Sequence, residues 1–280
     1  MNRSLAPRPA TLLSSTVLAP DHRLLVFADS EQQPPLPGQF INVCVPGVGE
    51  FPVSTTGYAT PNGQIETCVR KAGRVTGALF AQAEGSQLGL RGPFGNGFLL
   101  QEFRDRDALL IAGGLGMAPL RALLLALLEE PYQARSVTLL YGSRSPESLL
   151  FSEQLQSLAK QGVIRLKFSV DFAEEQPWSD APGLCRIGLV TSLLEELPRL
   201  GEECVAAVCG PPILYSCILE QLCSAGIPAN QIYATLERRM RCGLGTCCHC
   251  VTAGHFVCTE GPVFSLAQLR DMPGAVEGIP

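Results

Sequence analysis

The chain has 280 residues, which is enough for two or three folded domains. Its formal net charge is −5 and it has no basic cluster, which argues against binding to nucleic acid. Hydrophobic residues make up 46% of the chain, but no apolar run is long enough to predict a membrane span, and the N-terminus lacks the apolar core of a signal peptide.

The first part of the chain, residues 1–101, alternates short apolar runs with turn residues. Apolar runs at 24–27, 40–45 and 65–70 are separated by Pro-Gly and Asn-Gly pairs. Many short strands at regular intervals predict an antiparallel β-barrel. Near its end, the run 70–76 places cations and backbone donors around Gly73, an arrangement that could hold a pyrophosphate.

The second part, residues 102–233, changes to an alternation of strands and helices, which predicts an α/β domain with a parallel sheet. We expect strands at 108–112, 136–141, 164–170 and 204–209, and helices at 119–128, 148–160 and 213–225.

Two turns rich in glycine and proline follow strands of this domain. The first contains Gly113, Gly114 and Gly116, with Pro119 near the start of the next helix. Such a turn presents free backbone N–H groups to an anion, although it lacks the G-x-G-x-x-G spacing. The second turn is formed by residues 209–212, and ligands of open α/β sheets bind at such strand ends. A third segment after a strand offers Ser143 and Arg144 to an adenosine end, and an ordinary surface arginine is the alternative.

The third part, residues 234–280, carries a group of cysteines with the spacing C-x4-C-x2-C…C: Cys242, Cys247, Cys250 and Cys258. This is the spacing of a plant-type [2Fe–2S] site. The segment is short and rich in glycine, so we expect little core of its own and a folding contribution from the metal.

Other interpretations of these cysteines are a zinc site, a disulfide framework and a Rieske-type site. Zinc sites usually have two close pairs, and only Cys247 and Cys250 form one. Disulfide frameworks are typical of small secreted chains. A Rieske site would require a second histidine to match His249, and His255 does not have the spacing. Cys248 is left over and should point away from the metal. The remaining cysteines are expected to be buried thiols, and together with a cluster they indicate a reducing, cytoplasmic compartment.

The order of these motifs resembles the ferredoxin–NADP reductase superfamily. The barrel contains Pro-Val-Ser at 52–54 and Gly-Arg-Val-Thr at 73–76, and it is followed by Arg-Gly-Pro-Phe-Gly-Asn-Gly-Phe at 91–98 and the two turns. The run 236–250 and the Cys-Thr-Glu-Gly-Pro-Val-Phe run at 258–264 are similar to the electron-transfer subunits of dihydroorotate dehydrogenase, of anaerobic sulfite reductase and of [NiFe] hydrogenases, where it is the gamma subunit. The resemblance covers nearly the whole chain.

The resemblance implies three regions: an FAD-binding barrel, an NAD(P)-binding α/β domain and a [2Fe–2S] segment. The residues that would contact FAD are Pro52, Val53, Ser54, Thr55, Val69, Arg70, Lys71, Gly73, Val75 and Thr76. Those that would contact the nicotinamide nucleotide are Gly113, Gly114, Gly116, Met117, Ala118, Pro119, Ser143, Arg144, Cys209, Gly210, Pro211 and Pro212. Ser54 would lie near the flavin and Cys209 near the nicotinamide, as the two catalytic candidates. One departure concerns the R-x-Y-S motif of the superfamily, whose arginine and tyrosine are Phe51 and Val53 here; Arg70 or Arg74 would replace the lost cation.

The sequence therefore predicts a subunit that moves electrons between NAD(P)H, FAD and a [2Fe–2S] cluster, to or from a larger redox subunit. The Gly-Glu-Phe-Pro-Val-Ser run favours a hydrogenase or sulfite reductase partner over dihydroorotate dehydrogenase. A reductase that works alone, and a zinc-stabilised nucleotide-binding module without redox chemistry, are the rival interpretations.

Overall fold

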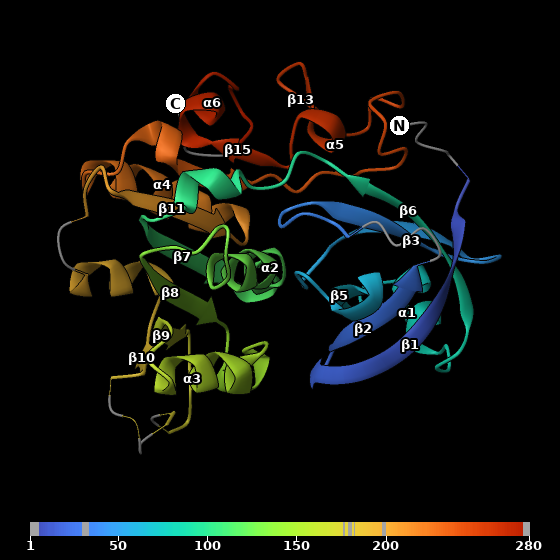
Figure 1. Cartoon of the computed structure of the whole chain (residues 1–280), viewed down its shortest axis with the longest axis horizontal. Helices are drawn as coiled ribbons and strands as arrows, with labels where there is room; N and C mark the ends of the chain where they lie inside the picture. Colours follow the sequence, from blue (N-terminus) through green and yellow to red (C-terminus); the bar gives the residue numbers. More distant parts are fainter. Residues whose placement is uncertain are drawn as a thin grey trace.

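The computed structural model describes residues 6–29, 34–175, 177–178, 181, 183–197 and 200–276. The outermost residues of the first and last expected parts, 1–5 and 277–280, lie outside the described residues. Figure 1 shows two bodies side by side, a blue barrel and a green-to-orange α/β layer structure, with the red C-terminal segment lying across one end of both.

The first body is a six-stranded antiparallel sheet in the order β4-β3-β6-β1-β2-β5. A bridge between Thr55, just after β4, and Thr67 in β5 joins the two outer strands, so the sheet closes into the expected barrel. The elements are β1 (Arg8–Ala19), β2 (His22–Asp29), β3 (Phe40–Val45), β4 (Gly49–Ser54), β5 (Ile65–Arg70), α1 (Arg74–Phe80) and β6 (Gln87–Phe94).

Alternating apolar residues build the barrel core. In β3, the side chains of Ile41, Val43 and Val45 are buried in one cluster with residues of the other strands. The Pro-Gly pairs form turns as expected, since Gly38 and Gly47 have φ values of +87° and +72°, a region that favours glycine. The short helix α1 packs on the barrel through Leu79.

The second body is a seven-stranded sheet in the order β10-β9-β8-β7-β11-β12-β15. All pairs are parallel except β12–β15, and helices cover the sheet as predicted. The strands are β7 (Asp107–Gly113), β8 (Ser136–Ser143), β9 (Arg165–Val170), β10 (Cys185–Ile187), β11 (Cys204–Cys209) and β12 (Ile232–Thr235), and the helices are α2 (Met117–Leu127), α3 (Ser152–Lys160) and α4 (Pro212–Ser224).

One helix begins later than the sequence predicts. The helix expected from residue 148 begins at Ser152, because Leu149 is extended and Phe151 adopts a left-handed conformation with φ of +58°. The short 3₁₀ turn Pro146–Ser148 precedes it.

The C-terminal segment shares the core of the α/β domain. Its elements are β13 (Val251–Thr252), β14 (His255–Phe256), α5 (Val257–Glu260), β15 (Val263–Ser265) and α6 (Leu266–Arg270). Strand β15 pairs with β12, which itself crosses the boundary expected at residue 233. Phe264, Leu266 and Leu269 are buried in the same cluster as β11 and α4. The division into three domains therefore stays a prediction. In the part of the chain that the structure describes, no helix is both long and apolar enough to cross a membrane.

Candidate functional site

A cleft of about 760 Å³ lies between the barrel and the α/β domain. Its size is in the range of cofactor and ligand sites. The barrel contributes residues of β4 and β5 and the start of α1, and the α/β domain contributes the turns after β7, β8 and β11. The sheet edge that faces the cleft is formed by the carboxyl ends of parallel strands, where α/β domains bind ligands.

The two glycine turns of the α/β domain touch each other at this edge. A Cβ on Gly116 would lie 2.0 Å from the carbonyl oxygen of Cys209, and a Cβ on Gly113 would lie 2.9 Å from Cδ of Pro211. Gly114, with φ of +52°, faces open space. Only glycine permits this close approach, which leaves a smooth backbone surface on which a nucleotide could lie.

The hydroxyl of a buried tyrosine holds the first turn. Tyr141 Oη donates a hydrogen bond to the carbonyl of Gly114 at 3.1 Å and accepts one from the N–H of Leu150 at 3.0 Å. Burial raises the pKa of Tyr141, so the hydroxyl stays protonated and able to donate.

Twelve of the predicted cofactor residues line the cleft: Pro52, Val53, Val69, Arg70, Thr76, Gly113, Gly114, Gly116, Ser143, Arg144, Gly210 and Pro211. The sequence thus brought together residues that the fold places around one space. Arg70 is the cation of the 70–76 run that faces the cleft, whereas Arg74 donates from Nη2 to the carbonyl of Val48.

The other predicted residues do not line the cleft in the described part of the chain. Ser54 pairs with Phe40 across β3–β4, Thr55 is buried, and Val75 packs on the barrel cluster. Gly73 precedes α1, and Pro212 begins α4. Met117, Ala118 and Pro119 are buried in the first turn of α2, behind the glycine turn. Their contacts with cofactors stay predictions.

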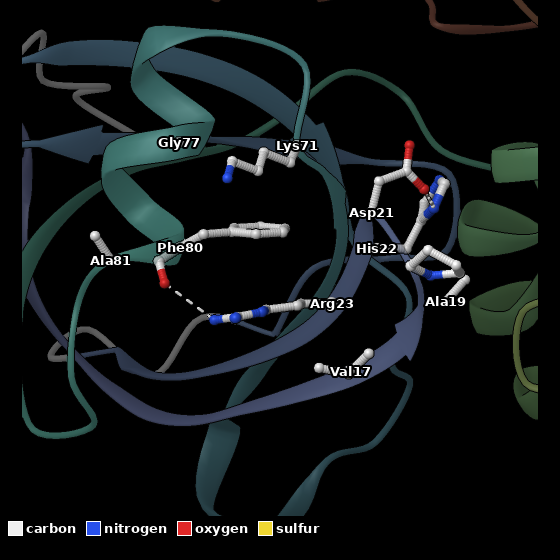
Figure 2. Close-up of a pocket in the computed structure, with 10 residues that line it drawn as sticks. Val17, Ala19, Asp21, His22, Arg23, Lys71, Gly77, Phe80 and Ala81 are labelled. Atoms are coloured by element: carbon white, nitrogen blue, oxygen red, sulfur yellow. Dashed lines mark hydrogen bonds and ion pairs between the residues drawn. The ribbon is translucent and has the colours of Figure 1, made fainter.

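Lys71 lies in a smaller pocket of about 320 Å³ beside α1 (Figure 2). Figure 2 shows the Phe80 ring between the Lys71 and Arg23 side chains, and the Arg23 guanidinium lies 4.8 Å from the ring centroid. Asp21 and His22 line both this pocket and the cleft, so the two spaces are neighbours.

Cys209 is buried behind the second turn. Its Sγ lies 2.8 Å from the Thr235 hydroxyl, and Tyr215 Oη accepts a hydrogen bond from the N–H of Gly210 and donates one to the carbonyl of Thr235. Burial raises the pKa of the Cys209 thiol to about 12, although the Thr235 hydrogen bond lowers it. This thiol is a protonated part of the turn's support, and its expected place near the nicotinamide stays a prediction.

Several cleft residues were missed by the sequence analysis, among them Glu237, Asp171 and Thr191. Burial raises the pKa of Glu237, and the charge of Arg70 partly offsets this effect. Its position beside the cysteine motif was visible in the sequence. Asp171 follows β9 at the same sheet edge as the other turns, which could have identified it.

The cysteine loop has an arrangement that could hold a metal cluster. Cys242, Cys250 and Cys258 are buried, Cys247 is half-buried, and Cys248 is exposed, as expected for the surplus thiol. Backbone N–H groups point at the sulfurs: Leu244 N lies 3.3 Å from Cys242 Sγ, and Gly245 N lies 3.2 Å from Cys258 Sγ. Gly243 and Gly245 have φ values of +75° and +71°, which this loop path requires.

Hydrogen bonds prepare one of these thiols to ionise. Burial disfavours the Cys242 thiolate, but hydrogen bonds from the Thr246 side chain and from the backbone of Leu244, Thr246 and Cys247 lower the pKa of Cys242 to about 5. A thiolate is the form that binds metal.

The cysteine positions fit a binuclear cluster better than a single zinc ion. No group of three or more His, Cys, Asp or Glu side chains within the described ranges is placed to hold one metal ion. Zinc would need four ligands around one point, whereas a cluster with two irons needs two ligands around each. Cys250 and Cys258 already form a side-chain hydrogen bond with each other, as one such pair. His249 and His255 bond to the Cys247 carbonyl and to Glu260.

Comparisons with known proteins agree with this division of the molecule. Residues 110–220 match the oxidoreductase NAD-binding domain, and residues 237–270 match the iron–sulfur cluster binding domain of dihydroorotate dehydrogenase B. The gamma subunit of sulfhydrogenase 2 from Pyrococcus furiosus is 37% identical over 82% of this chain and 82% of its own length. A probable dihydroorotate dehydrogenase B electron-transfer subunit from the same organism is 33% identical over 87% and 85% of the two chains.

A solved structure of an NADH-dependent reduced ferredoxin–NADP oxidoreductase, studied for flavin-based electron bifurcation, has the same fold. It superposes with a TM-score of 0.73 and 22% identity, over 95% of this chain and 90% of that one. The chain thus belongs to the family of the sulfhydrogenase gamma and dihydroorotate dehydrogenase B electron-transfer subunits, built on a ferredoxin–NADP reductase-like fold.

Proposed function

We propose that this chain is the electron-transfer subunit of a cytoplasmic heteromeric complex that couples a nicotinamide nucleotide to a larger redox subunit through FAD and a [2Fe–2S] cluster. The observation that carries the proposal is the cleft, which the barrel and the two glycine turns share, together with a four-cysteine loop seated on the same barrel. When bound, the flavin takes a hydride from the nicotinamide and the cluster passes its electrons on one at a time.

The chain's own residues bind and orient these groups. Pro52 and Val53 form an apolar wall for the flavin, and Arg70 and Thr76 offer a cation and a hydroxyl to its pyrophosphate. Across the cleft, Gly113–Gly116 and Gly210–Pro211 present backbone to the nicotinamide nucleotide, and Ser143 and Arg144 lie where an adenosine end would extend.

No acid or base is required of the protein in this function, since the electron carriers supply the chemistry. Cys209 supports the second turn through Thr235 and Tyr215. Cys242, Cys247, Cys250 and Cys258 would ligate the cluster, with the N–H groups of Leu244 and Gly245 directed at the sulfurs.

A [NiFe] hydrogenase is the partner that we favour. The sulfhydrogenase gamma subunits are 37% and 36% identical to the chain, compared with 33% for the first dihydroorotate dehydrogenase relative. Dihydroorotate dehydrogenase is the second candidate, because the cluster segment matches the iron–sulfur domain of that enzyme. We expect the partner to dock beside the cluster loop, where Cys248, His249 and Arg241 are exposed.

The test is purification of the intact complex from native extract without oxygen, followed by identification of the subunits and analysis of cofactors. The proposal predicts flavin, iron and sulfide bound to this chain, and nickel in the co-purifying subunits. Flavin and iron with a dihydroorotate-oxidising partner would change the partner only. A colourless chain that holds one zinc ion and no flavin would overturn the function.

A further inference from the structure

We propose that Arg91 is the positioning residue that fixes the cluster loop onto the barrel. The proposal rests on the proposed function, because it concerns the placement of the same cluster site. Arg91 lies in β6, opposite Asn42 of β3, and is only 3% exposed. A buried arginine needs partners for its charge and its donors, so the identity of these partners shows what the residue does.

The partners of Arg91 are the two carbonyls at the start of the cluster loop and one carboxylate. Its Nη1 donates to the carbonyl of Cys242 and its Nη2 to that of Arg241, both at 2.7 Å. Its Nε and Nη2 also donate to the two carboxylate oxygens of Glu50, at 2.9 and 2.6 Å. One planar guanidinium thus joins two barrel strands to the backbone of a cluster cysteine, a geometry that lysine cannot reproduce.

Two further barrel residues press on the same point. Asn42 Nδ2 donates to the carbonyl of Arg241 at 2.9 Å, so this oxygen accepts two hydrogen bonds. A Cβ on Gly243 would lie 2.7 Å from the ring of Phe94, so the loop lies directly against that ring. The Arg91 guanidinium is also 5.6 Å from the centroid of the Phe94 ring.

The turn after β6 holds the other end of the loop. Asn96 Nδ2 donates to the carbonyls of Glu260 and Val263 at 2.9 and 2.8 Å, and the Asn96 N–H donates to Gly261 at 2.7 Å. A Cβ on Gly95 would lie 2.7 Å from the carbonyl oxygen of Gly261. Residues 91–96 therefore hold the chain on both sides of the Cys242–Cys258 segment.

This seam connects the cluster to the barrel that forms one wall of the cleft. Its hydrogen bonds do not involve the α/β domain, so a change in the angle between barrel and α/β domain would leave the place of the cluster on the barrel unchanged. Arg91 is the central residue of the seam, because it alone combines the fork to both carbonyls with a buried charge pair.

The first test is hydrogen exchange of the apo protein, which needs no cofactor. Arg91→Ala should speed exchange across residues 241–261 about tenfold or more, since this change removes charge-assisted hydrogen bonds there. Asn42→Ala should have a smaller effect in the same segment and serves if Arg91→Ala does not fold. The matched control is Arg8→Ala, because Arg8 is also a partly buried arginine that pairs with Asp29 and donates to the carbonyl of Gly92 but does not touch the loop. Unchanged exchange in Arg91→Ala, or equal acceleration in Arg8→Ala, would overturn the proposal.

The second test uses the loaded protein and separates charge from geometry. Arg91→Ala should lower the cluster's midpoint potential, because the Glu50 charge remains beside it, and should slow cluster reduction by NAD(P)H about 10–100-fold. Arg91→Lys should keep the potential near the wild-type value and still reduce slowly, since the fork is lost. Wild-type potential and rate in both variants would overturn the proposal. If the wild type holds no cluster, the proposed function fails, and the exchange comparison still decides the role of Arg91.

Discussion

Arg121 of α2 and Glu66 of β5 form an ion pair that joins the α/β domain to the barrel, with Nη1 2.6 Å from Oε2. The same guanidinium donates to the carbonyl of Thr56 and to Oε1 of Gln154, and it lies 4.8 Å from the centroid of the Phe151 ring. This contact and the Arg91 seam hold the barrel at two separate places, one against each of its neighbours.

Removal of the Arg121 side chain should therefore loosen the two bodies. We expect Arg121→Ala to lower the free energy of unfolding by about 1.5–3 kcal/mol, because the Thr56 carbonyl and the Glu66 carboxylate lose a charged donor. Urea denaturation of the apo protein measures this. The control is Arg135→Ala, whose ion pairs with Asp107 and Glu203 are exposed and should contribute about 0–1 kcal/mol. Equal losses in both variants would contradict the assigned role of Arg121.

A side chain at Gly116 should disrupt the nucleotide side of the cleft. The Cβ of Gly116→Ala would lie 2.0 Å from the Cys209 carbonyl, so one of the two turns must move, at a cost of about 1–3 kcal/mol. We expect weaker binding of NAD(P)H, measured by titration of intrinsic fluorescence or by calorimetry. Gly201→Ala is the control, since its Cβ would meet nothing within 4 Å. Binding of NAD(P)H at wild-type affinity by Gly116→Ala would show that the nucleotide does not use this turn.

The cysteine assignments can be separated by two neighbouring substitutions. Cys242→Ser should lose the cluster and its iron, because this buried thiol is one of the four proposed ligands. Cys248→Ser should retain both, because that thiol is exposed. Iron analysis and electron paramagnetic resonance of the reduced proteins distinguish the two. Loss of the cluster in Cys248→Ser with retention in Cys242→Ser would reverse the assignment.

Buried thiols should make the apo protein less stable in alkali. Burial raises the pKa of both Cys68 and Cys209 from 9.0 to about 12. Between these values the unfolded chain has lost protons that the folded chain keeps, so stability is intact below about pH 9 and falls as pH rises towards 12, by up to about 1.4 kcal/mol per pH unit for each thiol. Urea denaturation as a function of pH should show this slope, and Cys209→Ser should reduce it. The exposed Cys217 is the control: if Cys217→Ser reduced the slope equally, burial would not be the cause.

The sequence was informative where a local pattern determines the chemistry. The cysteine spacing, the glycine turns and the alternation of strands predicted the cluster loop, the cleft wall at Gly113–Gly116 and the barrel, because each depends on residues close together in the chain. Arg91 and Arg121 were missed, since their partners lie far away: Cys242 is 151 residues from Arg91, and Glu66 is 55 from Arg121. The sharing of one core between the cluster segment and the α/β sheet was missed for the same reason, since it depends on the β12–β15 pairing.

An anaerobic titration of the intact chain with NADH or NADPH tests the central claim most directly. Absorbance follows the flavin, and electron paramagnetic resonance follows the cluster in the same samples. The account predicts that the flavin band bleaches and that the signal of a reduced [2Fe–2S] cluster appears with it, while Cys242→Ser shows the bleaching alone. A nucleotide that binds without bleaching a flavin, in a chain that holds one zinc ion, would contradict the account.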